Sequence, residues 1–521
     1  MKSAADGLFV GFDLGTSSLK GVAVTAGGEV VARGYAAYTT VREAAGQAEQ
    51  DPAAWLRAVR RVVRQLEAAA PPARWRAIGL SAMIPTLVTV DRAGAPTGPA
   101  VTWEDSRAEA QGETYRSRAV DAAAGARTTG AGVSLYEHTG QWVDGRYLLP
   151  MWMRLRATEG ERAASTTRLL SAKDYLYWWL TGESATDPST ASGFGCYDLA
   201  GSRWTAAGAE AGGVIAADDA ESSAGAPGTP GLPAVLPSAT LRPLSAAAAA
   251  RLGLPAGLPV CLGAADSVLG MFALGVSAPG DVAYITGTSS VIVGVSEELL
   301  VDARHRYLVT PLARSTHWGL EMDLLSTGSA VRWMSKLLKL GAHGEARLME
   351  LAASAPREAD EVRVLPFLGG GEQGALWDPD LRGAVLDLGL SHGPAELARG
   401  LVNGIVFESR RCLDVLEQNG LSRSPIRIAG TGASAAFFRQ RLADVSGRPV
   451  LFARDPERPF SALGAARVAA DALGCSPAED SAWSGSLELT EPDATQRDEW
   501  ERRWTKHRGA VECLQQLYAK R

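Results

Sequence analysis

The sequence predicts an α/β protein of two domains, and three observations support this prediction. The chain has 521 residues, a length that exceeds one ordinary hydrophobic core and favours two large domains. Strand-like and helix-like segments alternate along most of it, which is typical of mixed sheets covered by helices. The tetrapeptide Gly-Thr-Ser-Ser occurs at residues 15–18 and again at 287–290, each time between two apolar, strand-like runs.

The first tetrapeptide forms the tip of an expected hairpin at 12–24, and a third strand is expected at 28–37. Asp51 and Pro52 then supply a helix cap and a first-turn proline. The helix that follows carries one apolar stripe and places arginines on its other face. The stripe consists of Trp55, Val59, Val62, Val63 and Leu66. A strand at 76–83 completes the set.

The second tetrapeptide repeats this order, with strands expected at 281–296, 306–313 and 317–325 and a helix at 329–341. Helices and strands then alternate through 400–474. Between the halves, residues 207–234 are rich in Gly, Ala, Ser, Pro and Asp, a composition that builds no strong core. We therefore expect domains at 1–258 and 259–521, with similar folds around the two tetrapeptides.

Composition excludes several classes of protein. The formal net charge is -6 and the pI is about 5.7, so the footprint of a general nucleic-acid binder is missing. No apolar run approaches the roughly 20 residues of a membrane span, and the amino terminus lacks the apolar segment of a secretion signal. Five separated cysteines indicate neither a disulfide framework nor a zinc site. We expect a cytoplasmic protein.

The two hairpin tips present backbone N–H groups and hydroxyls that suit a polyphosphate. Asp13 lies just before the first tip, where a carboxylate can hold Mg²⁺ through water, although an Asx turn would use the same residue. The chain contains no Gly-Lys dipeptide, which excludes the lysine-bearing P-loop. Turn residues that recur by chance are the alternative interpretation of the tips.

Three further segments contain candidate catalytic or binding residues. Asp266 follows a strand-like run and stands among small residues, so it can accept the proton of an attacking hydroxyl or, alternatively, cap a helix. The segment 102–108 combines an aromatic side chain with charged partners for a sugar, a mixture that a surface loop with an ion pair would share. Gly430-x-Gly432-x-x-Ala435 has the form of a dinucleotide fingerprint, so a nicotinamide-dependent oxidoreductase is a further alternative.

With these motifs assembled, the chain resembles the FGGY family of carbohydrate kinases over nearly its whole length, and in particular its xylulokinase branch. The motifs that carry the resemblance stand at 11–24, 103–108, 171–192, 263–267, 287–290, 365–383, 430–450 and 462–466. The resemblance implies an actin-like ATPase (ribonuclease H-like) fold, with two related domains around a central cleft. The first domain would bind mainly sugar, and the second mainly ATP.

The resemblance also implies roles for residues. Asp266 would be the catalytic aspartate and Asp13 would position Mg²⁺. The expected nucleotide contacts are Gly15, Thr16, Ser17, Gly287, Thr288, Gly328, Arg332, Thr431, Gly432 and Ala435. The expected sugar contacts are Ser81, Ala82, Met83, Ile84, Trp103, Asp105, Arg107, Asp266 and Ser267. A homodimer is expected by analogy with the family alone.

The substrate is expected to be D-xylulose, with another sugar, a polyol or an aldonate as the alternative. The alternative arises because xylulokinases usually have Gly-Gln-Met-His where this chain has residues 81–84, Ser-Ala-Met-Ile. The residue after the catalytic aspartate is commonly Asn and here is Ser267, and the Glu often found before the motif at 462–466 is replaced by Phe460-Ser461. A sugar or nucleotide sensor with weak catalysis, and an actin-like ATPase chaperone, are further alternatives.

Overall fold

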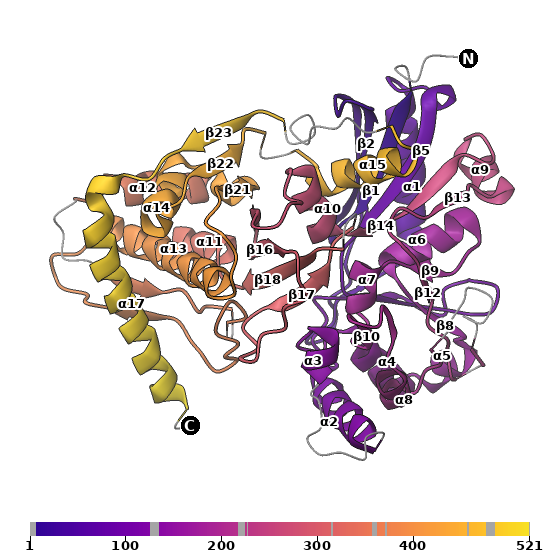
Figure 1. Cartoon of the computed structure of the whole chain (residues 1–521), viewed down its shortest axis with the longest axis horizontal. Helices are drawn as coiled ribbons and strands as arrows, with labels where there is room; N and C mark the ends of the chain where they lie inside the picture. Colours follow the sequence, from indigo (N-terminus) through magenta and orange to yellow (C-terminus); the bar gives the residue numbers. More distant parts are fainter. Residues whose placement is uncertain are drawn as a thin grey trace. The chain divides into compact units, whose positions relative to one another are not determined.

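The chain divides into two units, each built around its own mixed sheet (Figure 1). The computed structural model describes residues 7–125, 135–216, 225–226, 228–313, 316–356, 362–369, 372–455, 458–475 and 485–519. Unit 1 comprises Met1–Gly275, Val309–Thr316 and Pro459–Trp483. Unit 2 comprises Val276–Leu308, His317–Arg458 and Ser484–Arg521. No helix within the described ranges is both long and apolar enough to cross a membrane.

The main sheet of unit 1 has the strand order β13-β14-β5-β1-β2-β3. Its strands are β1 (Leu8–Leu14), β2 (Ser18–Thr25), β3 (Val30–Ala37), β5 (Trp75–Ala82), β13 (Leu241–Pro243) and β14 (Pro259–Ala265). The three central strands β1, β5 and β14 run parallel, whereas β2, β3 and β13 pair antiparallel to their neighbours. Because the central strands are parallel, their carboxyl ends meet at one edge of the sheet, where ligands bind in open α/β sheets.

Helices cover both faces of this sheet. On one face lies α1 (Pro52–Glu67), capped by the Asp51 side chain, together with α6 (Ala172–Thr181) and α9 (Ala246–Leu252). On the other face α15 (Phe460–Ala472) packs directly on glycines of the sheet. A Cβ at Gly11 would lie 1.8 Å from the Ala462 carbonyl oxygen, and one at Gly79 would lie 1.9 Å from that of Ala465. Glycine is therefore required at both positions for α15 to pack there.

The remaining elements of unit 1 surround this sheet. A second sheet has the order β4-β7-β6-β8, with β4 (Glu49–Gln50), β6 (Thr86–Val90), β7 (Ala100–Thr102) and β8 (Arg168–Ser171). Two short pairs are β9 (Ala185–Thr186) with β12 (Ala234–Val235) and β10 (Tyr197–Asp198) with β11 (Arg203–Trp204). The other helices are α2 (Glu109–Gly125), α3 (Leu135–Thr139), α4 (Leu148–Thr158), α5 (Gly160–Ser165), α7 (Pro188–Ser192), α8 (Ala206–Gly212), α10 (Asp266–Ala273) and the 3-10 turn η2 (Pro72–Arg74).

Unit 2 repeats the hairpin at the centre of its own sheet, where the strands that lie wholly within this unit have the order β18-β16-β15-β21-β22-β23. These strands are β15 (Val282–Thr286), β16 (Ser290–Ser296), β18 (Trp318–Leu324), β21 (Ile426–Ala429), β22 (Val450–Ala453) and β23 (Leu487–Thr490). The strand β17 (Leu308–Pro311) is divided between the units, with Leu308 in unit 2 and its other residues in unit 1. A small pair joins β19 (Arg363–Leu365) to β20 (Ala384–Leu386). The helices are α11 (Gly328–Leu337), α12 (Gly344–Ser354), α13 (Pro394–Gln418), α14 (Ala436–Ser446), α17 (Arg497–Tyr518) and the 3-10 turns η3 (Thr431–Ala433) and η4 (Ala494–Gln496).

Both tetrapeptides form hairpin tips as predicted, one between β1 and β2 and the other between β15 and β16. The predicted boundary after residue 258 differs from the structure, in which unit 1 continues to Gly275. The reason is strand pairing, because β14 lies parallel to β5 inside the first sheet. The helix α15 also belongs to unit 1, although almost two hundred residues of chain separate it from β14.

Candidate active site

Two aspartates stand at the carboxyl ends of parallel strands in unit 1. Asp13 is the penultimate residue of β1, opposite Ser81 of β5, and Asp266 directly follows β14. The Ser81 hydroxyl donates to Asp13 Oδ1 at 3.0 Å. Asp13 is almost fully buried, whereas Asp266 is partly exposed. The predicted catalytic and metal-binding residues therefore share one edge of one sheet.

Burial raises the pKa of Asp266 to about 7, and the nearby charge of Asp13 adds to the increase. Burial also raises the pKa of Asp13, against the opposing effects of Lys20 and the Ser81 hydrogen bond. A carboxyl group that titrates near neutral pH is suited to accept a proton from a reacting hydroxyl. The electrostatics thus distinguish Asp266 from an ordinary surface aspartate.

The backbone that leads into Asp266 contains a bulge in β14. The pairing of β14 with β5 shifts register between Cys261 and Ala264. Gly263, in the bulge, has a φ of 71°, and a Cβ there would lie 1.7 Å from the Leu80 carbonyl oxygen. Asp266 is then the first residue of α10, whose N-cap is Ala265. Asp266 is therefore not the N-cap residue itself, although its Oδ1 accepts the Ser267 N–H in the first turn of the helix at 2.9 Å.

The first hairpin tip is tied to the segment that contains Trp103. Gly15 N–H closes the turn on the Ser18 carbonyl at 3.0 Å. The Trp103 indole N–H donates to Thr16 Oγ1 at 3.1 Å, and Gln50 Nε2 donates to the Thr16 carbonyl at 2.7 Å. A hydroxyl that accepts one hydrogen bond keeps its own proton for a further acceptor. Thr16 can therefore still donate to a phosphate oxygen, and Ser17 is exposed beside it.

The four residues predicted to contact sugar at 81–84 are mostly turned into the protein. Ser81 donates to Asp13, and Ala82 and Met83 are each 2% exposed. Only Ile84 is partly exposed, and it packs against Gly193. The structure therefore gives no support to a direct sugar contact by the side chains of Ala82 and Met83, because both are buried at the end of β5.

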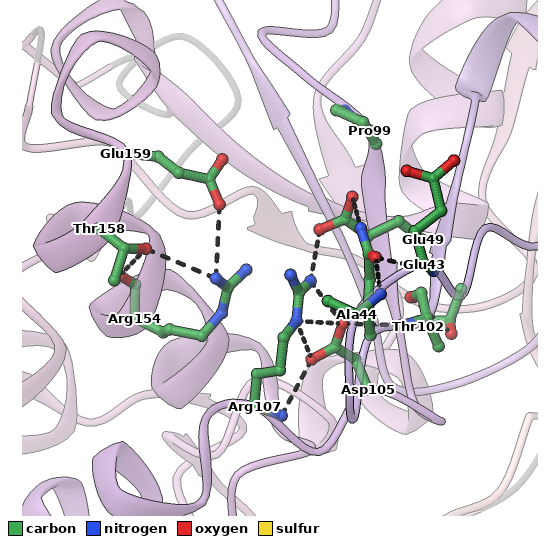
Figure 2. Close-up of polar contacts among 12 residues, drawn as sticks. Glu43, Ala44, Glu49, Pro99, Thr102, Asp105, Arg107, Arg154, Thr158 and Glu159 are labelled. Atoms are coloured by element: carbon green, nitrogen blue, oxygen red, sulfur yellow. Dashed lines mark hydrogen bonds and ion pairs between the residues drawn. The ribbon is translucent and has the colours of Figure 1, made fainter.

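Asp105, which is buried, forms an ion cluster with the partly exposed Arg107 and Glu49 (Figure 2). Asp105 is 1% exposed and accepts hydrogen bonds from Arg107 Nη2 at 2.6 Å and from the Ala48 N–H at 2.9 Å. Arg107 Nη2 also contacts the Glu49 carboxylate. The carboxylate of Asp105 is thus engaged by the protein, and the predicted direct contact of Asp105 with sugar lacks structural support. Arg107 remains partly exposed.

A second arginine, Arg154 of α4, turns its guanidinium toward Arg107 (Figure 2). Within the described part of the chain, hydrogen-bond partners are found for its Nη1 alone, at 3.5 Å from Thr158 Oγ1 and 3.4 Å from Glu159 Oε1. Its Nε and Nη2 are buried and have no hydrogen-bond partner among the described residues. Burial and the like charge of Arg107 lower the pKa of Arg154. Sequence reasoning missed this pair, because α4 carries no signal that points toward residue 107.

Replacing Arg154 with Met is expected to raise the unfolding free energy by about 1 kcal/mol, because an incompletely paired buried charge is exchanged for apolar packing. Denaturant unfolding of the whole chain measures the change. The matched control is Arg162→Met, since Arg162 in the same region donates to Thr89 Oγ1 at 3.1 Å, to Glu159 Oε2 at 3.0 Å and to the Pro99 carbonyl. Arg162→Met should lower stability. A loss with Arg154→Met as large as the control's would contradict this interpretation.

Unit 2 contains a cavity of about 760 Å³ next to the second hairpin tip. This volume lies in the range of small-molecule and cofactor sites. Five predicted nucleotide contacts line it, namely Gly287, Gly328, Thr431, Gly432 and Ala435. Arg332 is not in the lining and instead pairs through Nε with Glu345 Oε1 at 2.8 Å. Thr288 is also outside the lining, and its carbonyl accepts from the Ser329 N–H at 2.8 Å.

The walls of this cavity differ in chemistry. Near the tip they carry the hydroxyls of Thr286, Ser290 and Thr327, and Ser290 Oγ lies 2.8 Å from Thr327 Oγ1. Elsewhere they are mixed, with His343, Glu345 and Glu350 beside a set of apolar side chains. The apolar members include Met349, Ala353, Ile405, Phe437 and Phe438. Hydroxyls suit phosphate oxygens and the apolar wall suits a flat base. Sequence reasoning missed the contribution of α12 to this cavity. The two adjacent phenylalanines, Phe437 and Phe438, were the only signal in the sequence for the apolar wall.

Family models match both units in order. The N-terminal domain of the FGGY family of carbohydrate kinases matches residues 8–273, and its C-terminal domain matches 282–473. This chain belongs to the FGGY family of carbohydrate kinases. The boundary between the two matches agrees with Gly275 rather than with the predicted 258, and the family assignment confirms the predicted actin-like fold of two α/β domains.

Individual relatives of this FGGY kinase carry different substrate names. It is 27% identical over 462 residues to the xylulose kinase of Escherichia coli K12, covering 89% of each chain. It is 30% identical over 529 residues to the glycerol kinase of Allorhizobium ampelinum, covering 96% of this chain and 97% of that one. The crystal structure of xylulose kinase from Rhodospirillum rubrum matches with a TM-score of 0.86 and 27% identity over 98% of this chain and all of that one.

The family settles two points about this FGGY kinase. It is a phosphotransferase, and sugar kinases of this family use ATP. The nicotinamide alternative is wrong, because the chain belongs to a family of phosphotransferases and the residues that resemble a dinucleotide fingerprint lie within the match to its C-terminal domain. Among the described residues, no group of three His, Cys, Asp or Glu side chains forms a ready metal site. Asp13 therefore fits Mg²⁺ only as one ligand among waters and phosphate oxygens.

Proposed function

We propose that this kinase transfers the γ-phosphate of ATP to a hydroxyl of a small sugar or polyol, with D-xylulose as the acceptor to test first. The observation that carries the proposal is Asp266, a partly exposed carboxyl group whose pKa is raised to about 7 at the carboxyl edge of a parallel sheet. Relatives named xylulose kinase support the choice of acceptor.

In the proposed reaction, Asp266 accepts the proton of the acceptor hydroxyl while that oxygen forms a bond to the γ-phosphorus. The bond from the γ-phosphorus to the β–γ bridging oxygen breaks at the same time, and ADP leaves. Phosphoryl transfer needs mainly alignment and charge neutralisation. When bound, Mg²⁺ would neutralise phosphate charge, and Asp13 would hold it through water. Thr16 Oγ1, already fixed by Trp103, would donate to a phosphate oxygen.

The cavity of unit 2 is the proposed ATP site. Its hydroxyls and the backbone of Gly287 and Gly328 suit the phosphates, and the wall near Phe437 and Phe438 suits the adenine. Gly432 keeps the space next to Thr286 open, since a Cβ there would lie 3.2 Å from the Thr286 Cβ. The nucleotide roles of Gly15 and Ser17 are retained as part of this proposal.

The acceptor pocket offers few polar side chains at 81–84, because only the apolar Ile84 is partly exposed there. Polar groups left unpaired in a site are what reject a wrong substrate strongly. A pocket without them discriminates less between related acceptors. This observation keeps an aldonate and glycerol as alternatives to D-xylulose. Trp103, Arg107 and Ser267 are the proposed polar and aromatic contacts that remain.

ADP release, measured with D-xylulose, D-gluconate, glycerol and no acceptor, tests the proposal. The expected result is ADP release that depends on D-xylulose and exceeds release with the other two. Faster release with D-gluconate or glycerol would reassign the acceptor. Release that no acceptor stimulates, together with ATP binding, would overturn the proposed reaction in favour of a nucleotide sensor. A homodimer and a cytoplasmic location remain proposals from the resemblance, and light scattering tests the first.

A further inference from the structure

A fully buried ion network lies behind the end of β14. Lys173, Asp174 and Asp187 are each at most 1% exposed. Lys173 Nζ lies 3.0 Å from Asp174 Oδ1 and 3.2 Å from Asp187 Oδ1. Asp174 is further held in a capping box with Ser171 at the start of α6. Three buried charges are costly to desolvate, so a gain in stability alone does not account for the network.

The network reaches Asp266 through a single serine of α7. Ser189 donates both its N–H, at 3.0 Å, and its hydroxyl to Asp187 Oδ2. Because the hydroxyl proton is given to Asp187, the oxygen is oriented to accept. It accepts the Ala265 N–H at 3.0 Å. Ala265 immediately precedes Asp266, so the ion network fixes the peptide that leads into the catalytic residue.

A second serine holds the other side of Asp266. Ser461, at the start of α15, donates its hydroxyl to the Asp266 carbonyl oxygen at 2.9 Å. The helices α15 and α10 approach closely here, since a Cβ at Gly464 would lie 2.1 Å from the Leu269 carbonyl oxygen. Ser461 is one of the residues at which this chain departs from the usual family sequence, and its contact gives that departure a structural role.

We propose that Ser189 and Ser461 are positioning residues that aim the Asp266 carboxylate, with Asp187 and Lys173 fixing the Ser189 hydroxyl. The Asp266 carboxylate accepts the Ser267 N–H on Oδ1 at 2.9 Å and also the N–H of Asp266 itself. Both donors are backbone groups at the start of α10, so the direction of the carboxylate is set from the backbone on both sides. The inference rests on the proposed function, in which Asp266 receives the acceptor proton.

Single substitutions Ser189→Ala and Ser461→Ala test the inference by acceptor-dependent ADP release. Each is expected to lower kcat by about tenfold or more, because small displacements of a reacting group cost large factors in rate. The KM for ATP should stay within about twofold, since the proposed ATP cavity lies in unit 2. The matched control is Ser192→Ala, a buried serine of the same helix whose hydroxyl donates to the Pro188 carbonyl within α7. It should leave kcat unchanged, and Ser189→Thr should restore much of the loss.

The outcomes separate the inference from the proposed function. A kcat within about twofold of wild type in both Ser189→Ala and Ser461→Ala, with Asp266→Asn inactive, would overturn the positioning role and leave Asp266 as the base. An equal loss of kcat in Ser192→Ala would overturn it too, because general disturbance of α7 would then explain the effect. Full turnover by Asp266→Asn would overturn the proposed function itself. Should Ser189→Ala fail to fold, Ser461→Ala decides the question alone.

Discussion

Replacing Asp266 with Asn is expected to lower kcat by about 10³-fold, the scale of a lost general base. Asn has nearly the same shape and can still accept the Ser267 N–H, which now binds Asp266 Oδ1 at 2.9 Å. It cannot take a proton from the acceptor hydroxyl. ATP affinity, measured by calorimetry, should not change, because the proposed ATP cavity contains no residue of α10. Retention of more than about one-tenth of wild-type kcat would show that Asp266 is not the base.

The pH dependence of the wild-type enzyme gives a second readout of the same residue. The pKa of Asp266 is raised to about 7, chiefly by burial and then by Asp13. A base acts only when unprotonated, so kcat/KM should fall as the pH drops through this value and level off above it. An aspartate with an ordinary pKa would instead keep activity constant down to about pH 5. A flat profile between about pH 5 and 8 would contradict the assignment.

Replacing Gly328 with Ala is expected to raise the KM for ATP by about tenfold or more, because backbone must move to admit the new side chain. A Cβ at Gly328 would lie 2.2 Å from the Gly287 carbonyl oxygen. Both glycines line the cavity of unit 2, so the methyl group would displace the hairpin tip from α11. Steady-state kinetics with ATP varied at a fixed acceptor concentration measures the effect.

The control for Gly328→Ala is Gly509→Ala in α17 of the same unit. A Cβ at Gly509 meets nothing within 4 Å, and Ala favours the interior of a helix. Gly509→Ala should keep the KM for ATP and raise thermal stability slightly. If Gly328→Ala keeps the wild-type KM for ATP, the tip does not bind phosphate in the proposed manner. If the two variants raise KM equally, the effect comes from unit 2 as a whole.

Local patterns predicted much of the fold. The alternating apolar runs around the two tetrapeptides predicted hairpins that the structure contains, and Asp51 with Pro52 predicted the start of α1. These signals are local, so one sequence suffices to read them. The position of the domain boundary was not encoded by a local pattern. It depends on β14 pairing with β5, a contact across about 180 residues, and no spacing along the chain encodes that partner.

Only those features of the candidate site that depend on local sequence signals were predicted. Asp13 and Asp266 stand at strand ends, and strand ends are visible in the sequence. The burial of Asp105 depends on Arg107 folding back onto it and on Glu49 from another strand. The contact of Ser189 with Ala265 likewise joins α7 to β14. Side-chain direction at such positions follows from tertiary packing, which residue type and spacing do not determine.

A crystal structure with a non-hydrolysable ATP analogue and the acceptor that most stimulates ADP release would show directly whether Asp266 faces the reacting hydroxyl. We expect one acceptor hydroxyl within hydrogen-bond reach of the Asp266 carboxylate, about 2.6–3.2 Å. We also expect the adenine to lie in the cavity of unit 2, near Phe437 and Phe438. An acceptor bound with every hydroxyl beyond reach of Asp266, or a nucleotide bound outside that cavity, would contradict these expectations.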